Sequence, residues 1–267
     1  MGRIEAAFQR LRSEGRTGLI AFLTCGFPTR EETADLVRAL EEGGADLIEI
    51  GVPFSDPLAD GKTIQQADEI ALAQGVGLGD CLGVVAELRT GGLETPLVAM
   101  GYFNPILALG EREFAARAAA AGLDGVIVVD LPPEEADSFQ AVCREHGLDL
   151  IFLVAPTTTD QRLERIGRAG SGFIYCVSLT GTTGARSHLA SGLPEFMARV
   201  RRHTELPLAI GFGISTAEQF KAAGELADAV VIGTAIIDVI DRADARTRSE
   251  SVREYVEVVS GRRRANV

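Results

Sequence analysis

Two carboxylates in one short stretch, EIGVPFSDPLADG (49–61), have the residue types and surroundings for proton-transfer chemistry. Glu49 has apolar neighbours on both sides, and burial raises the pKa of a carboxyl group toward the range useful for proton transfer. A buried glutamate in a strand needs a partner or a task, so we expect Glu49 to be functional. Asp60 follows at the end of the loop. Between them, Asp56 could equally be a turn former or a cap.

Two carboxylates that face an apolar pocket without a metal fit acid-base chemistry on carbon, such as opening or closing a carbon–carbon bond. The histidines His146, His188 and His203 are too scattered for a zinc cluster, so we expect no metal. A Schiff-base aldolase would need a lysine at an inner strand end, since an imine requires an amine nucleophile. The only lysines are Lys62, in a loop-to-helix turn, and Lys221, in a late helix, so Lys62 alone keeps that alternative open.

Three glycine-rich turns in the last third of the chain indicate a phosphate site. They are TGTTGAR (180–186), GFG (211–213) and GTA (233–235). Glycine lets the backbone approach a ligand with its N–H groups exposed, and a helix that starts near Ala235 would add the positive end of its dipole. One such turn alone can be only a tight turn. Three of them in neighbouring loops predict that a phosphate group binds there.

Apolar side chains near the ends of the hydrophobic runs could enclose a flat ring. They are Phe22, Met100, Leu153, Tyr175 and Phe212. Each alone could be ordinary core. Beside a phosphate site, the set predicts a substrate with a phosphate at one end and an aromatic body at the other.

Eight runs rich in Val, Ile, Leu and Phe predict strands that are buried on both faces, as in parallel sheets. They are GLIAFLTCG (18–26), LIEIGVP (47–53), PLVAMGY (96–102), GVIVVD (125–130), LDLIFLV (148–154), GFIYCVS (172–178), LPLAIGFG (206–213) and ADAVVIGT (227–234). Between them lie helical patterns such as 30–44, 111–122 and 159–170, which end on glycines that suit C-terminal caps. The first residues, MGRIEAAFQR, predict an extra amphipathic helix.

Repeated strand–helix units without a linker predict a single (β/α)8 TIM barrel, one domain over residues 1–267, with an extra N-terminal helix. A doubly wound open sheet is the structural rival, but its G-x-G-x-x-G turn after the first strand is replaced by TCGFPTR. In such a barrel the chemistry sits at the C-terminal ends of the strands. Glu49, Phe22, Met100, Tyr102, Val129, Asp130, Leu153, Tyr175 and Phe212 all lie near these ends.

Composition and charge exclude several other classes of protein. The formal net charge of −12 disfavours nucleic acid and anionic membrane surfaces as partners. No apolar run approaches the roughly 20 residues that span a bilayer. The N-terminus is not a signal peptide, and the four cysteines form no C-x-x-C pair. We therefore expect a cytoplasmic protein with reduced thiols that binds neither nucleic acid nor membrane.

Several motifs together resemble the tryptophan synthase α subunit, in order along nearly the whole chain. They are EIGVPFSDPLADG, TIQQA, GYFNPI, GVIVVDLPPEEA, FLVAPTTT, GTTGAR and GFGIS. The resemblance implies retro-aldol cleavage of indole-3-glycerol phosphate to indole and glyceraldehyde 3-phosphate, without a cofactor in this chain. Glu49 matches the general acid-base residue of that family. Asp60 matches the carboxylate that stabilises positive charge on the indole nitrogen, and Thr183 matches the loop threonine that binds this carboxylate and closes the site.

The same resemblance assigns substrate and partner contacts. The phosphate would be held by Gly184, Gly213, Gly233 and Thr234, and the indole enclosed by Phe22, Met100, Tyr175 and Phe212. A β subunit that carries pyridoxal phosphate would dock at the barrel mouth in an α2β2 complex and receive indole through a tunnel. Pro53, Asp56, Phe103 and Asn104 would face this partner.

Two positions depart from the family pattern, and three alternatives stay open. Lys62 stands where the family commonly has proline, which puts the mobility of the loop in question, and Thr234 replaces a serine but keeps a hydroxyl. The chain could instead be a stand-alone indole-3-glycerol phosphate lyase or a non-catalytic subunit that activates a synthase. It could also be another phosphate-binding barrel, in which Glu49 and Asp60 are structural.

Overall fold

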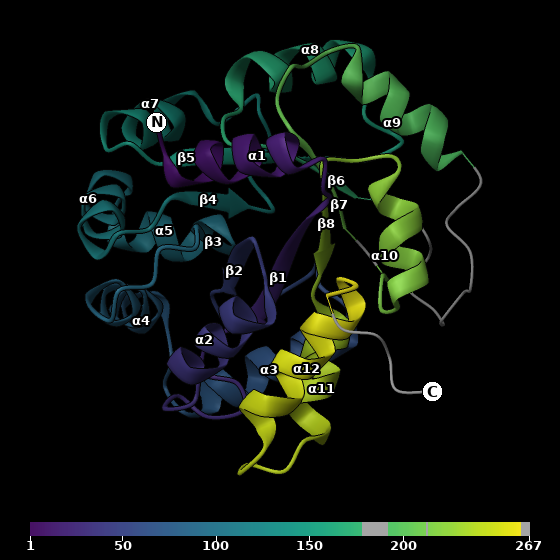
Figure 1. Cartoon of the computed structure of the whole chain (residues 1–267). Helices are drawn as coiled ribbons and strands as arrows, with labels where there is room; N and C mark the ends of the chain where they lie inside the picture. The colour runs from purple at the N-terminus through teal and green to yellow at the C-terminus, as the bar shows by residue number, and fades with distance from the viewer. Residues whose placement is uncertain (178–191, 212, 263–267) are drawn as a thin grey trace.

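The structure is a computed structural model that describes residues 1–177, 192–211 and 213–262. Eight parallel strands form a closed barrel in chain order (Figure 1). The strands are β1 (Gly18–Thr24), β2 (Leu47–Gly51), β3 (Leu97–Gly101), β4 (Gly125–Val128), β5 (Asp149–Val154), β6 (Ile174–Val177), β7 (Leu208–Gly211) and β8 (Ala229–Ile232). Each predicted hydrophobic run contains one strand. The TIM barrel predicted from the sequence is therefore confirmed, and the open-sheet rival is excluded.

Helices surround the barrel. In the described ranges they are α1 (Arg3–Glu14), α2 (Thr33–Gly43), α3 (Lys62–Ala73), α4 (Leu78–Thr90), α5 (Phe103–Leu109), α6 (Glu111–Ala121), α7 (Asp137–Glu145), α8 (Asp160–Ala169), α9 (Leu193–Arg201), α10 (Ala217–Gly224), α11 (Thr234–Arg242) and α12 (Arg248–Val259). The predicted glycine caps adopt left-handed backbone at Gly44 and Gly122, with φ of 100° and 88°. Gly170 is also the C-terminal cap of its helix, but its φ is −68°, so α8 ends in extended backbone.

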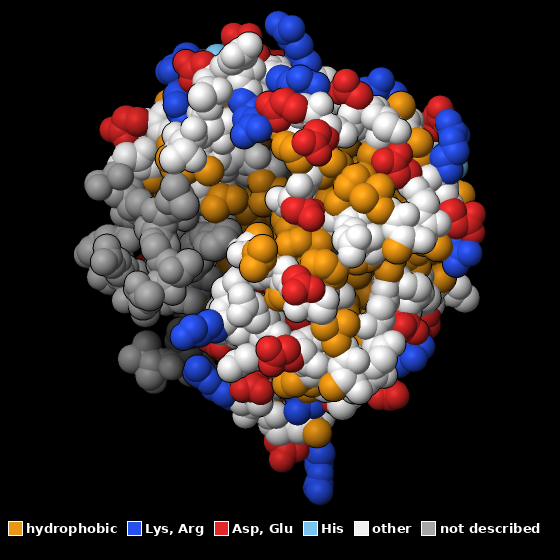
Figure 2. All heavy atoms as spheres, turned by 180° about the vertical axis from the view of Figure 1, so that it is seen from behind, with side chains coloured by type: hydrophobic (Ala, Val, Ile, Leu, Met, Phe, Trp, Pro, Cys, Tyr) orange, Lys and Arg blue, Asp and Glu red, His pale blue; other side chains and the backbone are white. Residues whose placement is uncertain are grey.

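The predicted N-terminal helix, α1, lies across one end of the barrel (Figure 1). Its buried side chains Ile4, Phe8 and Leu11 join the cluster inside the barrel, and the Phe8 ring lies 5.8 Å from the ring of Phe173 just before β6. This helix therefore closes the end at which the strands begin. The opposite face, seen in Figure 2, has hydrophobic side chains gathered around its middle, with acidic side chains among them.

Alternation along each strand separates two layers of core. On β2, Leu47 belongs to the cluster inside the barrel, whereas Ile48 and Ile50 belong to the cluster between strands and helices. Because side chains two residues apart point the same way, Glu49 shares the inward face with Leu47. The fold thus directs a carboxylate into the barrel.

The same hydrogen-bond pattern occurs four times at the N-terminal ends of the strands. A polar side chain just before each even-numbered strand accepts the N–H of a residue at the start of the preceding odd-numbered strand. The pairs are Asp46 with Leu19 (3.0 Å), Asp124 with Leu97 (2.8 Å), Ser171 with Leu150 (3.1 Å) and Asp228 with Leu208 (2.8 Å). Each aspartate also pairs with arginine. Backbone donors that would otherwise lack partners at this end are thereby satisfied.

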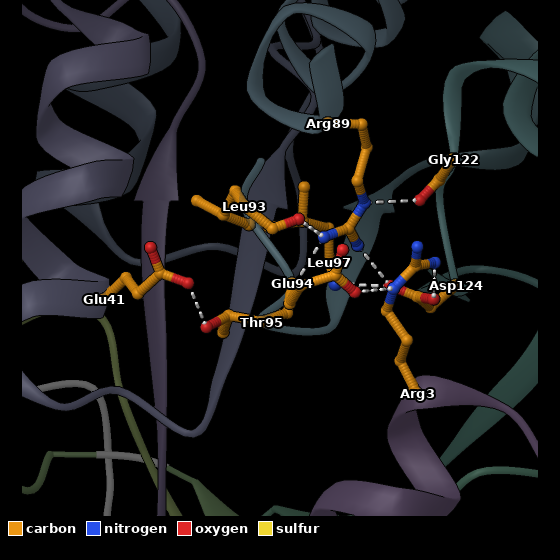
Figure 3. A network of polar contacts seen from close by, with 9 residues as sticks. All are labelled: Arg3, Glu41, Arg89, Leu93, Glu94, Thr95, Leu97, Gly122 and Asp124. Carbon is orange, nitrogen blue, oxygen red and sulfur yellow. Dashed lines mark hydrogen bonds and ion pairs between the residues drawn. The ribbon is translucent and has the colours of Figure 1, made fainter. Parts of the chain in front are cut away.

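Figure 3 shows one of these groups, around Asp124. The Arg89 guanidinium donates to Asp124 Oδ2 (2.6 Å) and to three backbone carbonyls, those of Leu93, Thr95 and Gly122. Arg3 of α1 donates to Asp124 Oδ1 (3.2 Å). Burial lowers the pKa of Arg89, and the Asp124 charge opposes this effect. The network ties α1 and the α4–β3 connection to the start of β4.

Among the described residues, no single helix is long and apolar enough to cross a membrane. The helices α3 and α4 meet the length and composition criteria only when taken together, and a 92° bend separates them.

Candidate active site

Glu49 lies inside the barrel near its open end. It pairs in register with Phe22 of β1 and Val98 of β3, and it is 0% exposed. Neither carboxylate oxygen has a hydrogen-bond partner among the described residues. Burial raises the pKa of Glu49 to about 8. The group is therefore mostly protonated at neutral pH and can act as a proton donor, as the sequence predicts for a functional carboxylate.

The aromatic rings of Phe22 and Tyr175 lie near this carboxyl group, and two glycines leave room for them. A Cβ on Gly51 would lie 2.6 Å from Cζ of Phe22, and one on Gly211 would lie 2.3 Å from the hydroxyl oxygen of Tyr175. Both rings are buried. Burial first, then the charges of Glu49 and Asp60, raise the pKa of Tyr175 well above its usual value. The Tyr175 hydroxyl thus stays neutral beside the carboxylates.

Asp60 is partly buried in the loop between β2 and α3, and Tyr102 holds it. The Tyr102 hydroxyl donates to Asp60 Oδ2 (2.7 Å) and accepts the N–H of Ala59 (2.9 Å). The Tyr102 ring stacks on Phe54 of the same loop, with ring centroids 4.9 Å apart. Burial raises the pKa of Asp60, and the Tyr102 hydrogen bond opposes this rise.

Tyr102 is a site residue to which the sequence assigned no role. Its place directly after β3, two residues beyond Met100, was the available signal. Its partner Asp60 lies 42 residues earlier in the chain, so their contact depends on the barrel bringing two neighbouring strand ends together.

The predicted phosphate residues lie where β7 and β8, paired neighbours, reach the open end of the barrel. Gly213 is exposed with φ of 71°, and Gly233 is the residue before α11, whose first residue, Thr234, is also exposed. A Cβ on Gly233 would lie 3.2 Å from Phe22, so this turn borders the aromatic wall. The N-terminus of α11 offers free N–H groups and the positive end of its dipole. Thr183, Gly184 and Phe212 lie outside the described residues.

Met100 is half-buried beside the cluster inside the barrel. It lies two residues beyond the inward-facing Val98, so it also points inward. Leu153 and Val129 also pack against this cluster. These side chains extend the apolar wall around Glu49.

The residues predicted to face a partner lie on the β2–α3 loop and on α5. Asp56 and Asn104 are exposed, and Phe103 is half-buried against Phe139 (5.5 Å between ring centroids). Pro53 is buried and so does not itself form part of the exposed surface. The same two segments expose large apolar side chains, with Leu58 93% and Leu107 52% exposed.

Neither a metal nor a Schiff base is supported by the geometry. In the part of the chain that the structure describes, no group of three or more His, Cys, Asp or Glu residues could hold a metal ion. Lys62 is exposed as the first residue of α3, and Lys221 is exposed on α10. Neither lysine lies on a strand that lines the barrel, so the aldolase alternative loses its nucleophile.

Comparison with known proteins identifies the family. The family model described as tryptophan synthase alpha chain matches residues 8–265. The tryptophan synthase alpha chain of Roseiflexus castenholzii is 54% identical over 98% of this chain and all of its own length, and that of Chloroflexus aggregans is 48% identical over the full length of both. Among solved structures, subunit alpha of tryptophan synthase from Legionella pneumophila superposes with a TM-score of 0.89 at 38% identity, covering 98% of each chain. The chain therefore belongs to the tryptophan synthase alpha chain family, a family of carbon–carbon lyases.

Proposed function

We propose that Glu49 and Asp60 carry out the retro-aldol cleavage of indole-3-glycerol phosphate to indole and glyceraldehyde 3-phosphate in tryptophan biosynthesis. The observation that carries this assignment is the Glu49 carboxyl group, buried at the open end of the barrel without a hydrogen-bond partner among the described residues. Its pKa of about 8 lets it both give and take a proton near neutral pH.

The chemistry needs two proton transfers and one stabilised charge. Glu49 protonates C3 of the indole, which turns the ring into an electron sink. The side-chain hydroxyl next to the breaking bond then loses its proton, and Glu49 takes up that proton as base. The carbon–carbon bond breaks, its electrons return to the ring to give neutral indole, and the hydroxyl carbon becomes the aldehyde. While C3 is protonated, Asp60 stabilises the positive charge on the ring nitrogen.

Separate groups of residues bind the phosphate and the indole of the substrate in this proposal. The turns at Gly213 and Gly233, with Thr234 at the N-terminus of α11, bind the phosphate through N–H groups and a hydroxyl. Phe22, Met100 and Tyr175 enclose the indole. Three further roles stay predictions from the sequence. Gly184 contributes to the phosphate site, Phe212 to the indole site, and Thr183 makes the closing contact to Asp60.

A second subunit completes the enzyme. A β subunit that carries pyridoxal phosphate docks over the β2–α3 loop and α5 in an α2β2 complex, where Asp56, Asn104 and Phe103 meet it together with Leu58 and Leu107. The exposed leucines support this surface. Pyridoxal phosphate belongs to the partner, because its Schiff base needs a lysine and both lysines here are exposed on outer helices.

Residues 1–267 form one domain in this proposal, since the eight strands close on themselves without a linker. The protein resides in the cytoplasm. Its four cysteines are all buried free thiols, which supports a reducing compartment.

The test is indole release from indole-3-glycerol phosphate, measured with and without a β subunit. Glu49→Gln should lower the rate by about 10²- to 10⁴-fold, because general acid-base catalysis contributes that much. Glu94→Gln, on an exposed side chain at the opposite end of the barrel, is the matched control and should keep the wild-type rate.

Each alternative predicts a different result in this assay. If wild type with its partner releases no indole, the proposed reaction is wrong. Full activity in Glu49→Gln would remove the role of that residue. Equal rates with and without the partner would indicate a stand-alone lyase. A chain that releases no indole but accelerates its partner would be a non-catalytic activator.

A further inference from the structure

The last helix, α12, follows the eight strand–helix repeats and has no task in the reaction described above. It packs against α2 and α11. Arg248 at its start donates to the backbone carbonyls of Ile240 (2.9 Å) and Ala243 (3.3 Å), at the end of α11. The helix is therefore fixed to α11, whose first residue, Thr234, belongs to one of the proposed phosphate turns.

One side chain of α12 reaches the β7–α10 loop, which carries Gly213 and is a second proposed phosphate turn. The Tyr255 hydroxyl donates to the backbone carbonyl of Ser215 (3.0 Å), which lies 40 positions earlier in the chain. Burial raises the pKa of Tyr255, and the charge of Asp238 on α11 adds to this rise. The hydroxyl therefore keeps its proton and remains a donor at neutral pH.

The backbone after Gly213 is held at each of the next three residues. Ile214 is 4% exposed and belongs to the core between strands and helices. The N–H of Ser215 donates to Gln219 Oε1 (2.9 Å), and the Thr216 hydroxyl caps α10 by accepting the N–H of Gln219 (3.3 Å). These two bonds are local to the loop and α10. The bond from α12 instead fixes the Ser215 carbonyl to a different part of the molecule.

An open cavity of about 500 Å³ lies beside both turns. Ser215 of the β7–α10 loop, Ala235 of the turn at α11 and Tyr255 line it together. Packing between α12 and the loop is therefore incomplete on this side. A directional hydrogen bond can fix the position of the loop where packing does not.

We propose that Tyr255 is a positioning residue for phosphate binding: by holding the Ser215 carbonyl, its hydroxyl keeps the backbone at Gly213 in the conformation that binds the phosphate. This rests on the proposed function, in which the Gly213 turn binds the substrate phosphate. Gly213 has φ of 71°, and a glycine has many other conformations available to it. Fixing the residues that follow it lowers the entropy lost on binding, so the affinity for phosphate rises.

Two variants, each lacking one hydroxyl group of α12, test this role by ligand binding. Tyr255→Phe removes the donor and keeps the ring, and Ser251→Ala is the matched control from the same helix and the same cavity. Tyr255→Phe should weaken the binding of glycerol 3-phosphate, measured by calorimetry, by about 3- to 10-fold, the effect of one neutral hydrogen bond. Its binding of indole, which has no phosphate, should not change. Ser251→Ala should bind both ligands as wild type does.

Steady-state kinetics of indole release, with the β subunit present, separate positioning from a general loss of structure. Tyr255→Phe should raise KM for indole-3-glycerol phosphate by the same factor as the dissociation constant of glycerol 3-phosphate and leave kcat unchanged. The reason is that a phosphate held equally in the ground state and the transition state contributes to binding only. A general loss of structure would lower kcat and weaken indole binding as well, and that result would contradict the proposal.

Amide hydrogen exchange gives a readout that does not depend on activity. In the protein without ligand, residues 213–216 should exchange faster in Tyr255→Phe than in wild type and Ser251→Ala. If either this exchange or the affinity for glycerol 3-phosphate is unchanged in Tyr255→Phe, the proposal is wrong.

The same measurements distinguish failure of this role from failure of the proposed function. If wild type binds glycerol 3-phosphate but releases no indole, the proposed reaction fails, and the binding and exchange data still decide the role of Tyr255. If wild type does not bind glycerol 3-phosphate, the phosphate site and the role of Tyr255 are both wrong.

Discussion

At the scale of single residues, two buried carboxylates on neighbouring parts of the chain have opposite surroundings. Asp46, just before β2, accepts two hydrogen bonds from Arg16 (2.8 and 2.9 Å) and one from the N–H of Leu19. Glu49, on the strand itself, has no such partner among the described residues. The Asp46 oxygens are therefore occupied by protein donors, whereas those of Glu49 are available to a substrate, so Glu49 and not Asp46 is suited to catalysis.

The unusual environment of Glu49 predicts a pH-dependent loss of stability. Its pKa is about 8 in the folded chain, against an ordinary value of 4.5. Between these values the unfolded chain has lost the proton that the folded chain retains, so the free energy of unfolding falls as pH rises from about 4.5 to about 8. Glu49→Gln should lack this contribution. Its stability relative to wild type should therefore increase across that range, as measured by urea unfolding at several pH values.

A stability difference between wild type and Glu49→Gln that does not vary with pH would mean that Glu49 titrates normally. The control is Glu94→Gln, since Glu94 is 82% exposed and lies at the other end of the barrel.

At the scale of elements, the starts of the strands and their ends have different tasks. Four side chains before the even-numbered strands accept N–H groups of the odd-numbered strands, and they lie at the end that α1 covers. The site residues Glu49, Tyr102 and Thr234 lie at the other end. The strand caps thus lie at the end of the barrel away from the candidate site. This division leaves the open end free to carry unpaired groups.

The repeated strand cap predicts graded losses of stability. Asp124→Ala should destabilise the fold by about 3 to 5 kcal/mol, because Arg89, only 11% exposed, would be left without its ionic partner. Ser171→Ala removes a neutral hydrogen bond and should cost about 1 kcal/mol. Both effects are measured from urea unfolding midpoints, and indole release by the folded fraction should stay at the wild-type rate.

Glu94→Ala is the matched control for this series, since Glu94 also pairs with Arg3 but is 82% exposed, and it should cost only about 0 to 1 kcal/mol. Equal losses for Asp124→Ala and Glu94→Ala would show that the buried pair gives no special stability.

At the scale of the whole molecule, the barrel is a core closed at one end and open at the other. The helix α1 fills the closed end with Ile4, Phe8 and Leu11 (Figure 1). The open end combines the buried Glu49 with exposed apolar side chains such as Leu58. A helix from outside the eight strand–helix repeats therefore completes the core at the closed end, and the candidate site lies at the open end.

This arrangement predicts that stability and turnover can be changed separately. Phe8→Ala should cost about 3 kcal/mol by leaving a cavity against Phe173. It should leave kcat for indole release nearly unchanged at a temperature where the variant is folded, because the closed end does not touch the site. Thermal unfolding and kinetics on the same sample check this. A large fall in kcat without loss of stability would show that the two ends are coupled.

Much of the site was predictable from the sequence because it depends on local patterns. The apolar residues on both sides of Glu49 in the chain predict its burial, and the structure places this residue at 0% exposure. The glycine turns after the last strands were predicted at the open end of the barrel, and the structure places Gly213 and Gly233 there; their binding of phosphate stays a prediction. The roles of Thr183, Gly184 and Phe212 stay predictions from the sequence.

The sequence by itself determined the eight strands, their burial on both faces, the extra helix and the inward position of Glu49, because hydrophobic spacing along one segment fixes each of these. Only the tertiary structure decided which distant groups meet. The hydrogen bond between Tyr102 and Asp60 and the four strand caps join residues that closure of the barrel brings together. Spacing along the chain carries no signal for such contacts, since they arise between neighbouring strands and their loops.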